Sequence, residues 1–333
     1  MANSLVTGGA GFIGSHLVER LLADGDSVSV LDNFATGSMK NLESVSDHPR
    51  LSVHEVSIAE PESIAPLFQG VERVYHLAGL ADIVPSIERP QEFHHANVNG
   101  TLAVLEASRE AKVKRFVYAA SSSCYGLPDR VPTPETDEIR PMYPYALTKY
   151  LGERYVLHWN DIYQLPAISL RLFNVYGPRA RTSASYGAVF NIFLAQKLSG
   201  KAFTVVGDGT QTRDFTFVTD VADAFVLAAE SNLAGEVFNV GSGGTYSINH
   251  LTSLLGGDIT YIPKRPGEPD CTFADTSKIT QALGWKPQVG FEEGVARMLE
   301  AIDQWREAPL WDSKSIETAT HEWFAHLGSS GSD

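Results

Sequence analysis

Short β-branched runs alternate with segments of helical periodicity through the first half of the chain. The apolar runs at 4–7, 27–32, 73–79 and 115–122 predict strands. Apolar residues at helical spacing predict helices over Phe12–Ala23, about 60–69 and Glu92–Ala111. On the last of these helices we expect a core-facing side made of Val98, Leu102, Leu105 and Val113. This order predicts βαβ units and an α/β fold, a doubly wound parallel sheet covered by helices on both faces.

The second half of the chain is less regular. A helix is expected over 145–159, with Pro144 in its first turn, and a strand with its exit loop over 167–179. Shorter helices are predicted near 186–199, 219–230, 247–255 and 291–306. We expect a nucleotide-binding domain over 1–172, to which later strands return, a smaller interleaved C-terminal α/β part over 173–327 that binds substrate, and a disordered tail at 328–333.

Composition narrows the class of partner. The chain has 333 residues, 43% of them apolar, and a formal charge of −14 without any long block of like charge. Such an acidic surface repels nucleic acid and anionic membranes, so we expect a small-molecule ligand. The two cysteines, Cys124 and Cys271, are too few for a disulfide framework, and no apolar run reaches the roughly 20 residues of a membrane span. We expect a cytoplasmic protein.

The segment TGGAGFIGSH at 7–16 contains the spacing G-x-G-x-x-G in Gly9, Gly11 and Gly14, between a predicted strand and a predicted helix. Such glycines allow a tight turn and a close approach of the backbone to a pyrophosphate at the helix N-terminus. An ordinary glycine-rich turn is the alternative. Asp32 closes the second strand, where a carboxylate accepts from a ribose 2′-hydroxyl and repels a 2′-phosphate. The segment therefore predicts a Rossmann-type domain that binds NAD rather than NADP.

A second group of residues predicts redox chemistry. The segment SSSCYG at 121–126 ends a predicted strand, and Tyr145 and Lys149 lie on one face of the next helix. A lysine ammonium and a nearby nicotinamide cation would stabilise the phenolate of Tyr145, whose usual pKa of about 10 makes it a poor base. The phenolate could then take a proton from a substrate hydroxyl that a serine orients. A solvated Tyr/Lys pair beside a serine-rich turn is the alternative.

Nine ordered segments together resemble one family. TGGAGFIGSH, VLDN, HLAG, SSSCYG, YALTK, RLFNVYGPR, GDGTQTRDFTFVTDVA, NVGSG and ADTSKITQALGWKP are similar to the extended short-chain dehydrogenase/reductases, and most similar to nucleotide-sugar 4-epimerases of the UDP-glucose and UDP-N-acetylglucosamine type. The resemblance spans roughly residues 3–307. It implies an NAD cofactor that oxidises C4 of a UDP-hexose to a ketone and returns the hydride to the opposite face within one turnover.

The resemblance assigns roles at matching positions. Tyr145 becomes the base, Lys149 its partner and Ser121 the orienting serine, with Ser122 and Ser123 as neighbouring candidates. The cofactor residues that it implies are Gly8, Gly11, Phe12, Ile13, Gly14, Asp32, Asn33, Leu77, Ala78, Gly79, Tyr145 and Lys149. The substrate residues that it implies are Asn174, Arg213, Arg265, Glu268 and Thr272. No metal is implied, and relatives often form homodimers through the helices at 92–111 and 145–160.

Two positions separate this chain from related activities. Nucleotide-sugar 4,6-dehydratases carry an Asp-Glu pair where this chain has Ser122 and Ser123, and UDP-glucuronate decarboxylases carry Glu at the second. Because only hydroxyls stand here, elimination lacks its acid and base. Epimerases of other nucleotide sugars (UDP-uronates, CDP- or dTDP-sugars), a net oxidoreductase and a non-catalytic NAD-binding protein stay open as alternatives.

Three further positions shape expectations about specificity. Thr272 matches the position that gates the sugar pocket in the family, where a small residue admits an N-acetyl group. Ser57 replaces an acidic residue near the adenine, which predicts a weaker adenine contact, and Asp82 is an acid near the expected phosphates without an explanation. His321 and His326 in HEWFAH are five residues apart and leave one helical face, so we expect no metal there.

Overall fold

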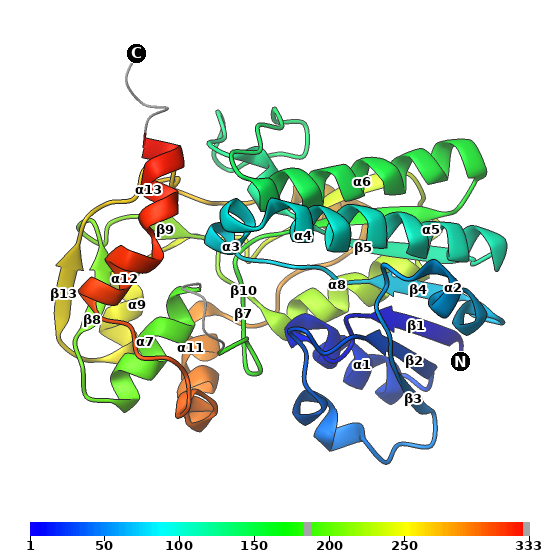
Figure 1. Ribbon diagram of the computed structural model, residues 1–333, viewed down its shortest axis with the longest axis horizontal. Helices are drawn as coiled ribbons and strands as arrows, with labels where there is room; N and C mark the ends of the chain where they lie inside the picture. Colours follow the sequence, from blue (N-terminus) through cyan, green and yellow to red (C-terminus); the bar gives the residue numbers. More distant parts are fainter. Residues whose placement is uncertain (183–187, 329–333) are drawn as a thin grey trace.

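A seven-stranded parallel sheet forms the centre of the larger part of the molecule (Figure 1). The computed structural model describes residues 1–182 and 188–328. The strand order is β11-β6-β5-β4-β1-β2-β3. The bounds are β1 Asn3–Thr7, β2 Ser27–Asp32, β3 Leu51–Glu55, β4 Arg73–His76, β5 Arg115–Ser121, β6 Ala167–Leu172 and β11 Glu236–Val240. Successive strands are added outward from β1 toward one edge of the sheet and from β4 toward the other, and their carboxyl ends lie at a single edge. This order confirms the doubly wound α/β fold expected from the sequence.

Helices cover both faces of this sheet. On one face α1 (Phe12–Ala23) packs against α8 (Val218–Glu230), and on the other α5 (Gly100–Glu110) packs against α6 (Pro144–Tyr163) (Figure 1). Each face has its own buried apolar core, the first around Leu17 and Phe225 and the second around Val104 and Phe116. The central strands β4, β5 and β6 are buried on both sides, which explains their nearly continuous apolar sequence.

A smaller part carries the rest of the second half. Two parallel strands, β8 (Phe203–Val206) and β13 (Ile259–Ile262), lie beside α7 (Val189–Leu198), α9 (Ile248–Leu255) and α11 (Phe291–Glu300). Their core is aromatic, with Phe190, Phe215 and Phe291 packed around Tyr176.

The remaining helices and strands of the whole chain are α2 Pro61–Ile64, α3 Ile83–Glu88, α4 Pro90–His94, β7 Val175–Tyr176, β9 Thr212–Arg213, β10 Thr216–Phe217, β12 Tyr246–Ser247, α10 Ser277–Leu283, α12 Ser313–Ala319 and α13 His321–Leu327.

The helix expected over Glu92–Ala111 differs in detail. It begins at Pro90, passes through a π-turn at His95–Asn99 and ends at Glu110. Val113 lies beyond this end, so its place on the helix face was wrong, although its side chain is buried. The break follows from Lys112, whose φ of 56° cannot continue a right-handed helix. The π-turn itself points the amide of Asn97 at Leu80, whose backbone N–H and C=O it bonds at 2.7 and 2.9 Å.

Two expectations reach residues outside the described part. The helix near 186–199 is described from Val189 to Leu198, and positions 186 and 187 lie outside. Of the expected tail at 328–333, positions 329–333 lie outside the described residues. Among the residues that are described, no helix is long and apolar enough to cross a membrane.

Candidate active site

The glycine segment forms a turn that has no room for side chains. Gly8 has a φ of +70°, and a Cβ built on it would lie 2.7 Å from the backbone nitrogen of Ala78. A Cβ on Gly14 would lie 2.1 Å from the carbonyl oxygen of Gly8, inside any allowed contact. The turn ends at Gly11, after which α1 begins at Phe12 with free backbone N–H groups. This cradle, which a Cβ would fill, fits the pyrophosphate of a dinucleotide.

Asp32 supports this turn from the end of β2. One carboxylate oxygen accepts from the backbone N–H of Ala10 at 3.0 Å, and the other accepts from that of Phe34 at 2.9 Å. Burial raises the pKa of this carboxyl, while both backbone bonds oppose the rise. Since a carboxylate has about four lone-pair sites, two are left for the ribose hydroxyls of a dinucleotide. The adjacent Asn33 side chain caps its own loop by accepting from Ala35 N–H at 3.1 Å.

The segment Leu77–Gly79 follows β4 and meets the glycine turn at the same edge of the sheet. The backbone N–H of Ala78 donates to the Thr7 hydroxyl at 3.2 Å. A Cβ on Gly79 would lie 2.8 Å from the Asn97 amide oxygen and 3.9 Å from Nζ of Lys149. Phe12, Ile13, Leu77 and Gly79 line a cavity of about 580 Å³ that the redox residues also line.

Tyr145 lies in the first turn of α6 and faces Ser121, the last residue of β5. Burial raises the pKa of the Tyr145 phenol, and the nearby Ser121 hydroxyl opposes that rise. Ser121 is itself held, since its hydroxyl lies 2.8 Å from that of Ser123 and accepts from Ser123 N–H at 3.2 Å. Ser122 also lines the cavity. The tyrosine, the serines and the cavity thus meet as the sequence predicted.

Lys149 lies one turn further along α6. Its Nζ sits 4.4 Å from the centre of the Tyr118 ring, and the Tyr118 hydroxyl donates to the Lys149 carbonyl at 3.1 Å. Burial lowers the pKa of Lys149 to about 7, and the negative charge of Glu153 opposes that fall. The ammonium thus depends on nearby negative charge, such as a phenolate at Tyr145, to stay protonated.

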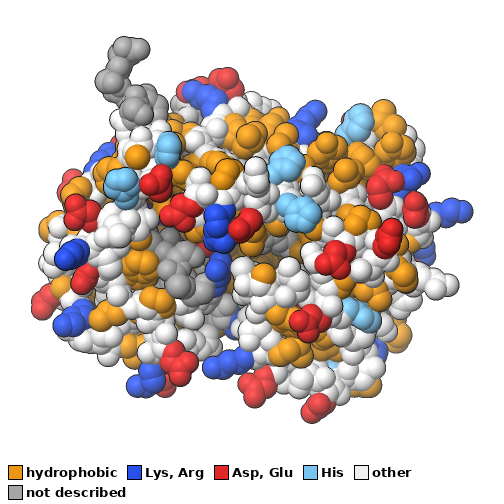
Figure 2. All heavy atoms as spheres, viewed as in Figure 1, with side chains coloured by type: hydrophobic (Ala, Val, Ile, Leu, Met, Phe, Trp, Pro, Cys, Tyr) orange, Lys and Arg blue, Asp and Glu red, His pale blue; other side chains and the backbone are white. Residues whose placement is uncertain are grey.

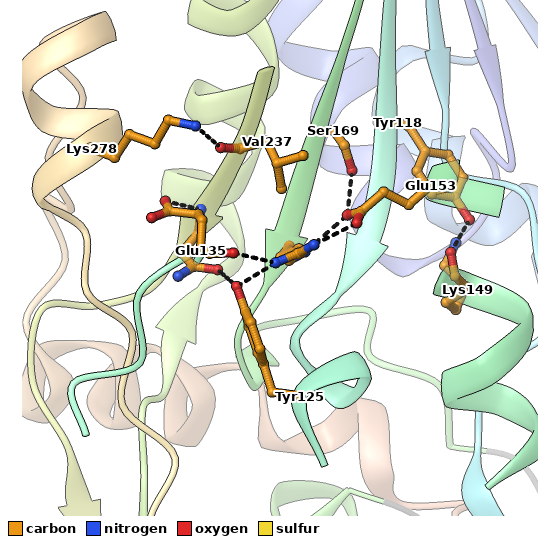
Figure 3. Close-up of polar contacts among 10 residues, drawn as sticks. Tyr118, Tyr125, Glu135, Lys149, Glu153, Ser169, Val237 and Lys278 are labelled. Atoms are coloured by element: carbon orange, nitrogen blue, oxygen red, sulfur yellow. Dashed lines mark hydrogen bonds and ion pairs between the residues drawn. The ribbon is translucent and has the colours of Figure 1, made fainter. Parts of the chain in front are cut away.

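A buried polar network continues from Lys149 toward the edge of the sheet (Figure 3). Glu153 accepts from two guanidinium nitrogens of Arg171, at 2.6 and 3.0 Å, and from the Ser169 hydroxyl at 2.9 Å. Arg171 also donates to the Tyr125 hydroxyl at 2.8 Å. The Tyr125 hydroxyl in turn donates to Asn239 on β11 at 2.7 Å. This network joins α6, β6, β11 and the turn at Ser122–Tyr125 that follows β5, and sequence reasoning missed it because its members are far apart along the chain.

The other end of the cavity is built around Thr272. Its hydroxyl donates to the Asn174 amide oxygen at 2.7 Å and accepts from the backbone N–H of Asp214 at 3.2 Å. Asp214 is fully buried, and its carboxylate accepts from the backbone N–H groups of Ala274, at 2.9 Å, and of Ser242. Thr272 is small, as the sequence indicated. The structure adds that its hydroxyl is hydrogen-bonded, which the sequence did not indicate.

The basic residues expected at the substrate end share one carboxylate. Glu268 accepts from Arg213 at 2.7 Å and pairs with Arg265 at 2.9 Å, and all three line the cavity. Arg213 also donates to the Thr212 carbonyl at 2.8 Å. Two guanidinium groups held beside one another suit the oxygens of a diphosphate. Glu268, expected among the substrate residues, also orients both arginines.

The structure gives Asp82 a partner that sequence reasoning missed. Its carboxylate pairs with Arg181 at 3.1 Å, and Asp82 takes the rare φ of 89° at the start of α3. Ser57 caps its own turn by accepting from Ala59 N–H at 3.3 Å.

Three other residues lie away from the cavity. His321 and His326 each pair with Glu322, at 3.1 and 3.2 Å. Burial raises the pKa of the Cys124 thiol to about 12, which makes it a core residue rather than a nucleophile. Within the described ranges no group of three or more His, Cys, Asp and Glu side chains could hold a metal ion.

Comparison with known proteins supports this picture. Residues 4–241 match the family described as "NAD dependent epimerase/dehydratase family". The chain is 36% identical over 305 residues to a UDP-glucose 4-epimerase of Mycolicibacterium smegmatis, covering 89% of this chain and 97% of that protein. It superimposes with a TM-score of 0.86 and 32% identity on the UDP-N-acetylglucosamine 4-epimerase of Methanobrevibacter ruminantium, covering 91% and 98%. The UDP-glucuronic acid 4-epimerase of Bacillus cereus, solved with UDP-glucuronic acid and NAD, gives a TM-score of 0.85 at 33% identity, covering 91% and 99%.

Proposed function

Because the chain belongs to the NAD dependent epimerase/dehydratase family, we propose that it inverts C4 of a UDP-hexose through a transient 4-keto sugar. The observation that carries this proposal is that one cavity is lined by Tyr145, Ser121 and Lys149 and also by Arg213 and Arg265, the two arginines that suit a diphosphate. A cavity that holds a redox pair at one end and a diphosphate clamp at the other fits a nucleotide sugar.

The mechanism divides among residues of this chain. NAD, when bound in the glycine cradle, supplies the acceptor and then the donor for the hydride of C4. Tyr145 takes the proton of the C4 hydroxyl during oxidation and returns a proton to the ketone oxygen afterwards. Ser121 holds that oxygen, and Lys149 stabilises the phenolate through its charge. Arg213 and Arg265 hold the diphosphate, so that the sugar can turn without leaving the site.

Two residues favour this reaction over those of relatives that eliminate water or carbon dioxide. Ser122 and Ser123 line the cavity beside Ser121, and neither has a carboxylate. Loss of water from C5 and C6 needs an acid and a base at these positions, and hydroxyls with their high pKa supply neither. Epimerisation needs only the tyrosine, the lysine and the serine.

For the substrate, we propose UDP-N-acetylglucosamine and UDP-N-acetylgalactosamine, with UDP-glucose and UDP-galactose accepted alongside. Thr272 is small and bonds the Asn174 side chain, and a small residue at this position supports acceptance of an acetamido group. A few added heavy atoms in a pocket change discrimination by about 1–3 kcal/mol, so a single residue there decides the preference.

Proton NMR tests the activity. The purified protein is incubated separately with UDP-glucose, UDP-N-acetylglucosamine and UDP-glucuronic acid, and the anomeric signals are followed for the C4 epimer. We expect conversion of the first two with no steady change in reduced-nicotinamide absorbance. Absence of any epimer would overturn the proposal, and stoichiometric accumulation of reduced cofactor would instead indicate a net oxidoreductase.

We also propose a homodimer through α4, α5 and α6. Figure 2 shows hydrophobic side chains and histidines gathered over these helices. On α6 the exposed apolar side chains are Leu147, Ile162 and Tyr163. Light scattering after size-exclusion chromatography should give twice the chain mass of 36.2 kDa. Replacing Leu147 and Ile162 by Glu should give the monomer, and a wild-type monomer would contradict the assignment.

A further inference from the structure

The last two helices, α12 and α13, follow the segments whose sequence is similar to the epimerases. α12 packs on the aromatic core of the smaller part through Ile316. α13 then crosses to the larger part, where it packs against α3 beside the cavity (Figure 1). The C-terminal helices therefore bridge the two parts at the cavity.

Trp323 is the residue of α13 that reaches the cavity. It is 5% exposed, and its indole N–H donates to the Pro266 carbonyl at 2.7 Å. The guanidinium of Arg265 lies 5.2 Å from the ring centre of Trp323. A cation over an indole face is attracted by the ring quadrupole, and the hydrogen bond fixes the backbone next to the same arginine. The Trp323 side chain thus holds Arg265 in two ways: its ring contacts the Arg265 guanidinium, and its N–H binds the backbone at the next residue, Pro266.

The same ring also contacts the catalytic side of the cavity. The ring of Tyr143 lies 6.5 Å from that of Trp323 and stacks on Tyr145 at 6.4 Å with an interplanar angle of 9°. Trp323 and Tyr143 therefore connect Arg265, the arginine that suits a diphosphate, with Tyr145, the tyrosine expected to act at C4. In a nucleotide sugar, the span between these two groups is the hexose and its linkage to the diphosphate.

We propose that Trp323 is a substrate-positioning residue: it fixes Arg265 for the diphosphate and sets the distance between that anchor and Tyr145. This inference rests on the proposed function, because it takes a nucleoside diphosphate sugar as the ligand. An arginine that is already held loses less conformational entropy when the diphosphate binds, so Trp323 strengthens binding without touching the reacting carbon.

The test compares Trp323→Ala and Trp323→Phe with Phe324→Ala. Phe324 is the neighbouring aromatic residue on α13 and is 39% exposed, so its loss controls for a general effect on the helix. The probe is UDP, titrated calorimetrically into the NAD-loaded protein, and KM and kcat are measured for the epimerised sugar. Amide exchange over 264–268 gives a readout that needs no substrate.

We expect Trp323→Ala to raise the Kd of UDP and the KM about tenfold with little change in kcat, and to speed exchange over 264–268. Trp323→Phe, which keeps a ring under Arg265 but loses the indole N–H, should restore part of the affinity. In an Arg265→Met background, Trp323→Ala should add little further loss, since both substitutions remove one interaction.

Several outcomes would overturn the inference. If Trp323→Ala matches Phe324→Ala in UDP affinity and exchange, or lowers only the unfolding temperature, Trp323 is a structural residue alone. If the losses of UDP affinity caused by Trp323→Ala and by Arg265→Met add fully in the double variant, Trp323 does not act through Arg265. The proposed function fails separately, if the wild-type protein binds UDP but forms no C4 epimer. In that case the difference in UDP affinity and amide exchange between the Trp323 and Phe324 variants still decides this inference.

Discussion

Glu153 and Arg171 form a buried bidentate ion pair, with nitrogen–oxygen distances of 2.6 and 3.0 Å, one helical turn along α6 from Lys149. Glu153 is 1% exposed and Arg171 is 5% exposed. The pair links the helix that carries Tyr145 and Lys149 to the carboxyl end of β6. It thereby serves both the packing of the fold and the charge at the active site.

Glu153→Gln should therefore have two effects. Removing one partner leaves a buried guanidinium without its counter-charge, which costs about 3–5 kcal/mol of unfolding free energy. It also removes the negative charge that supports the Lys149 ammonium, so the pKa of Lys149 should fall further below its usual value. The basic limb of the pH profile of kcat should then move to lower pH.

Urea unfolding and a kcat–pH series measure the two effects. Glu293→Gln is the matched control, since Glu293 forms an exposed i,i+4 pair with Arg297 and should cost no more than about 0.5 kcal/mol. Equal losses in the two variants would show that burial of the Glu153 pair has no energetic consequence, and an unmoved pH profile would disconnect Glu153 from Lys149.

Tyr145→Phe should reduce turnover by at least 10²–10⁴-fold, roughly the contribution of a positioned general base, while NAD stays bound. The hydroxyl alone is lost, and the ring keeps its stack on Tyr143. Turnover is followed by NMR and bound cofactor by absorbance after denaturation. Full activity in this variant would remove Tyr145 as the base.

Lys149→Met should abolish turnover and yet stabilise the protein near neutral pH. The pKa of Lys149 is lowered from 10.5 to about 7, so the unfolded chain binds a proton between these values that the folded protein does not. Wild-type stability should therefore rise with pH from about 7 to about 10.5, whereas the variant lacks this rise. Thermal unfolding across this window, without added substrate, compares the two proteins, and parallel curves would contradict the lowered pKa.

Two substitutions at Thr272 separate volume from hydrogen bonding. Thr272→Tyr should lower kcat/KM for the N-acetylated sugar about 10–200-fold relative to UDP-glucose, because the added ring fills the pocket. Thr272→Val keeps the volume but removes the bond to Asn174, so it should weaken both substrates equally. Unchanged preference in Thr272→Tyr would show that this position does not select the substrate.

Gly14→Ala should destroy NAD binding. Its Cβ would lie 2.1 Å from the Gly8 carbonyl, which the backbone of the turn cannot avoid. Gly290→Ala is the control, because its φ is −66° and no heavy atom lies within 4 Å of the added Cβ. Cofactor content after purification and the unfolding temperature distinguish the two, and an NAD-loaded Gly14→Ala protein would refute the close approach.

The buried carboxyl of Asp214 should make the free energy of unfolding fall as the pH rises from about 4 to about 6. Burial raises the pKa of its carboxyl from 3.8 to about 6, so between these values the folded protein holds a proton that the unfolded chain has released. The stability that this proton contributes is present below about pH 4 and is lost as the pH rises through 6. Asp214→Asn removes this dependence, at a cost of about 1–3 kcal/mol for the backbone N–H that its amide can no longer satisfy. Urea unfolding of both proteins on either side of this window should show a wild-type advantage that shrinks with rising pH, and a constant difference would contradict the prediction.

The sequence by itself determined what depends on near neighbours in the chain. The glycine spacing before α1, Asp32 at the end of β2, and Tyr145 and Lys149 one turn apart are patterns of a few residues, each tied to a local conformation. The alternation of strands and helices then fixed the parallel sheet, because a right-handed crossover leaves few other arrangements. The strands' carboxyl ends, and with them the cofactor and the serines, had to meet at one edge.

Only the tertiary structure decided which distant side chains pair inside the site. Arg171 meets Glu153, Arg181 meets Asp82, and Trp323 meets Arg265. Taken singly, each of these is an ordinary charged or aromatic residue with no local signal of its partner. The first pairing depends on how α6 packs on the sheet, and the other two depend on how segments far apart in the chain pack around the cavity. The free energy of burying a charge or a ring is set by that packing rather than by sequence spacing.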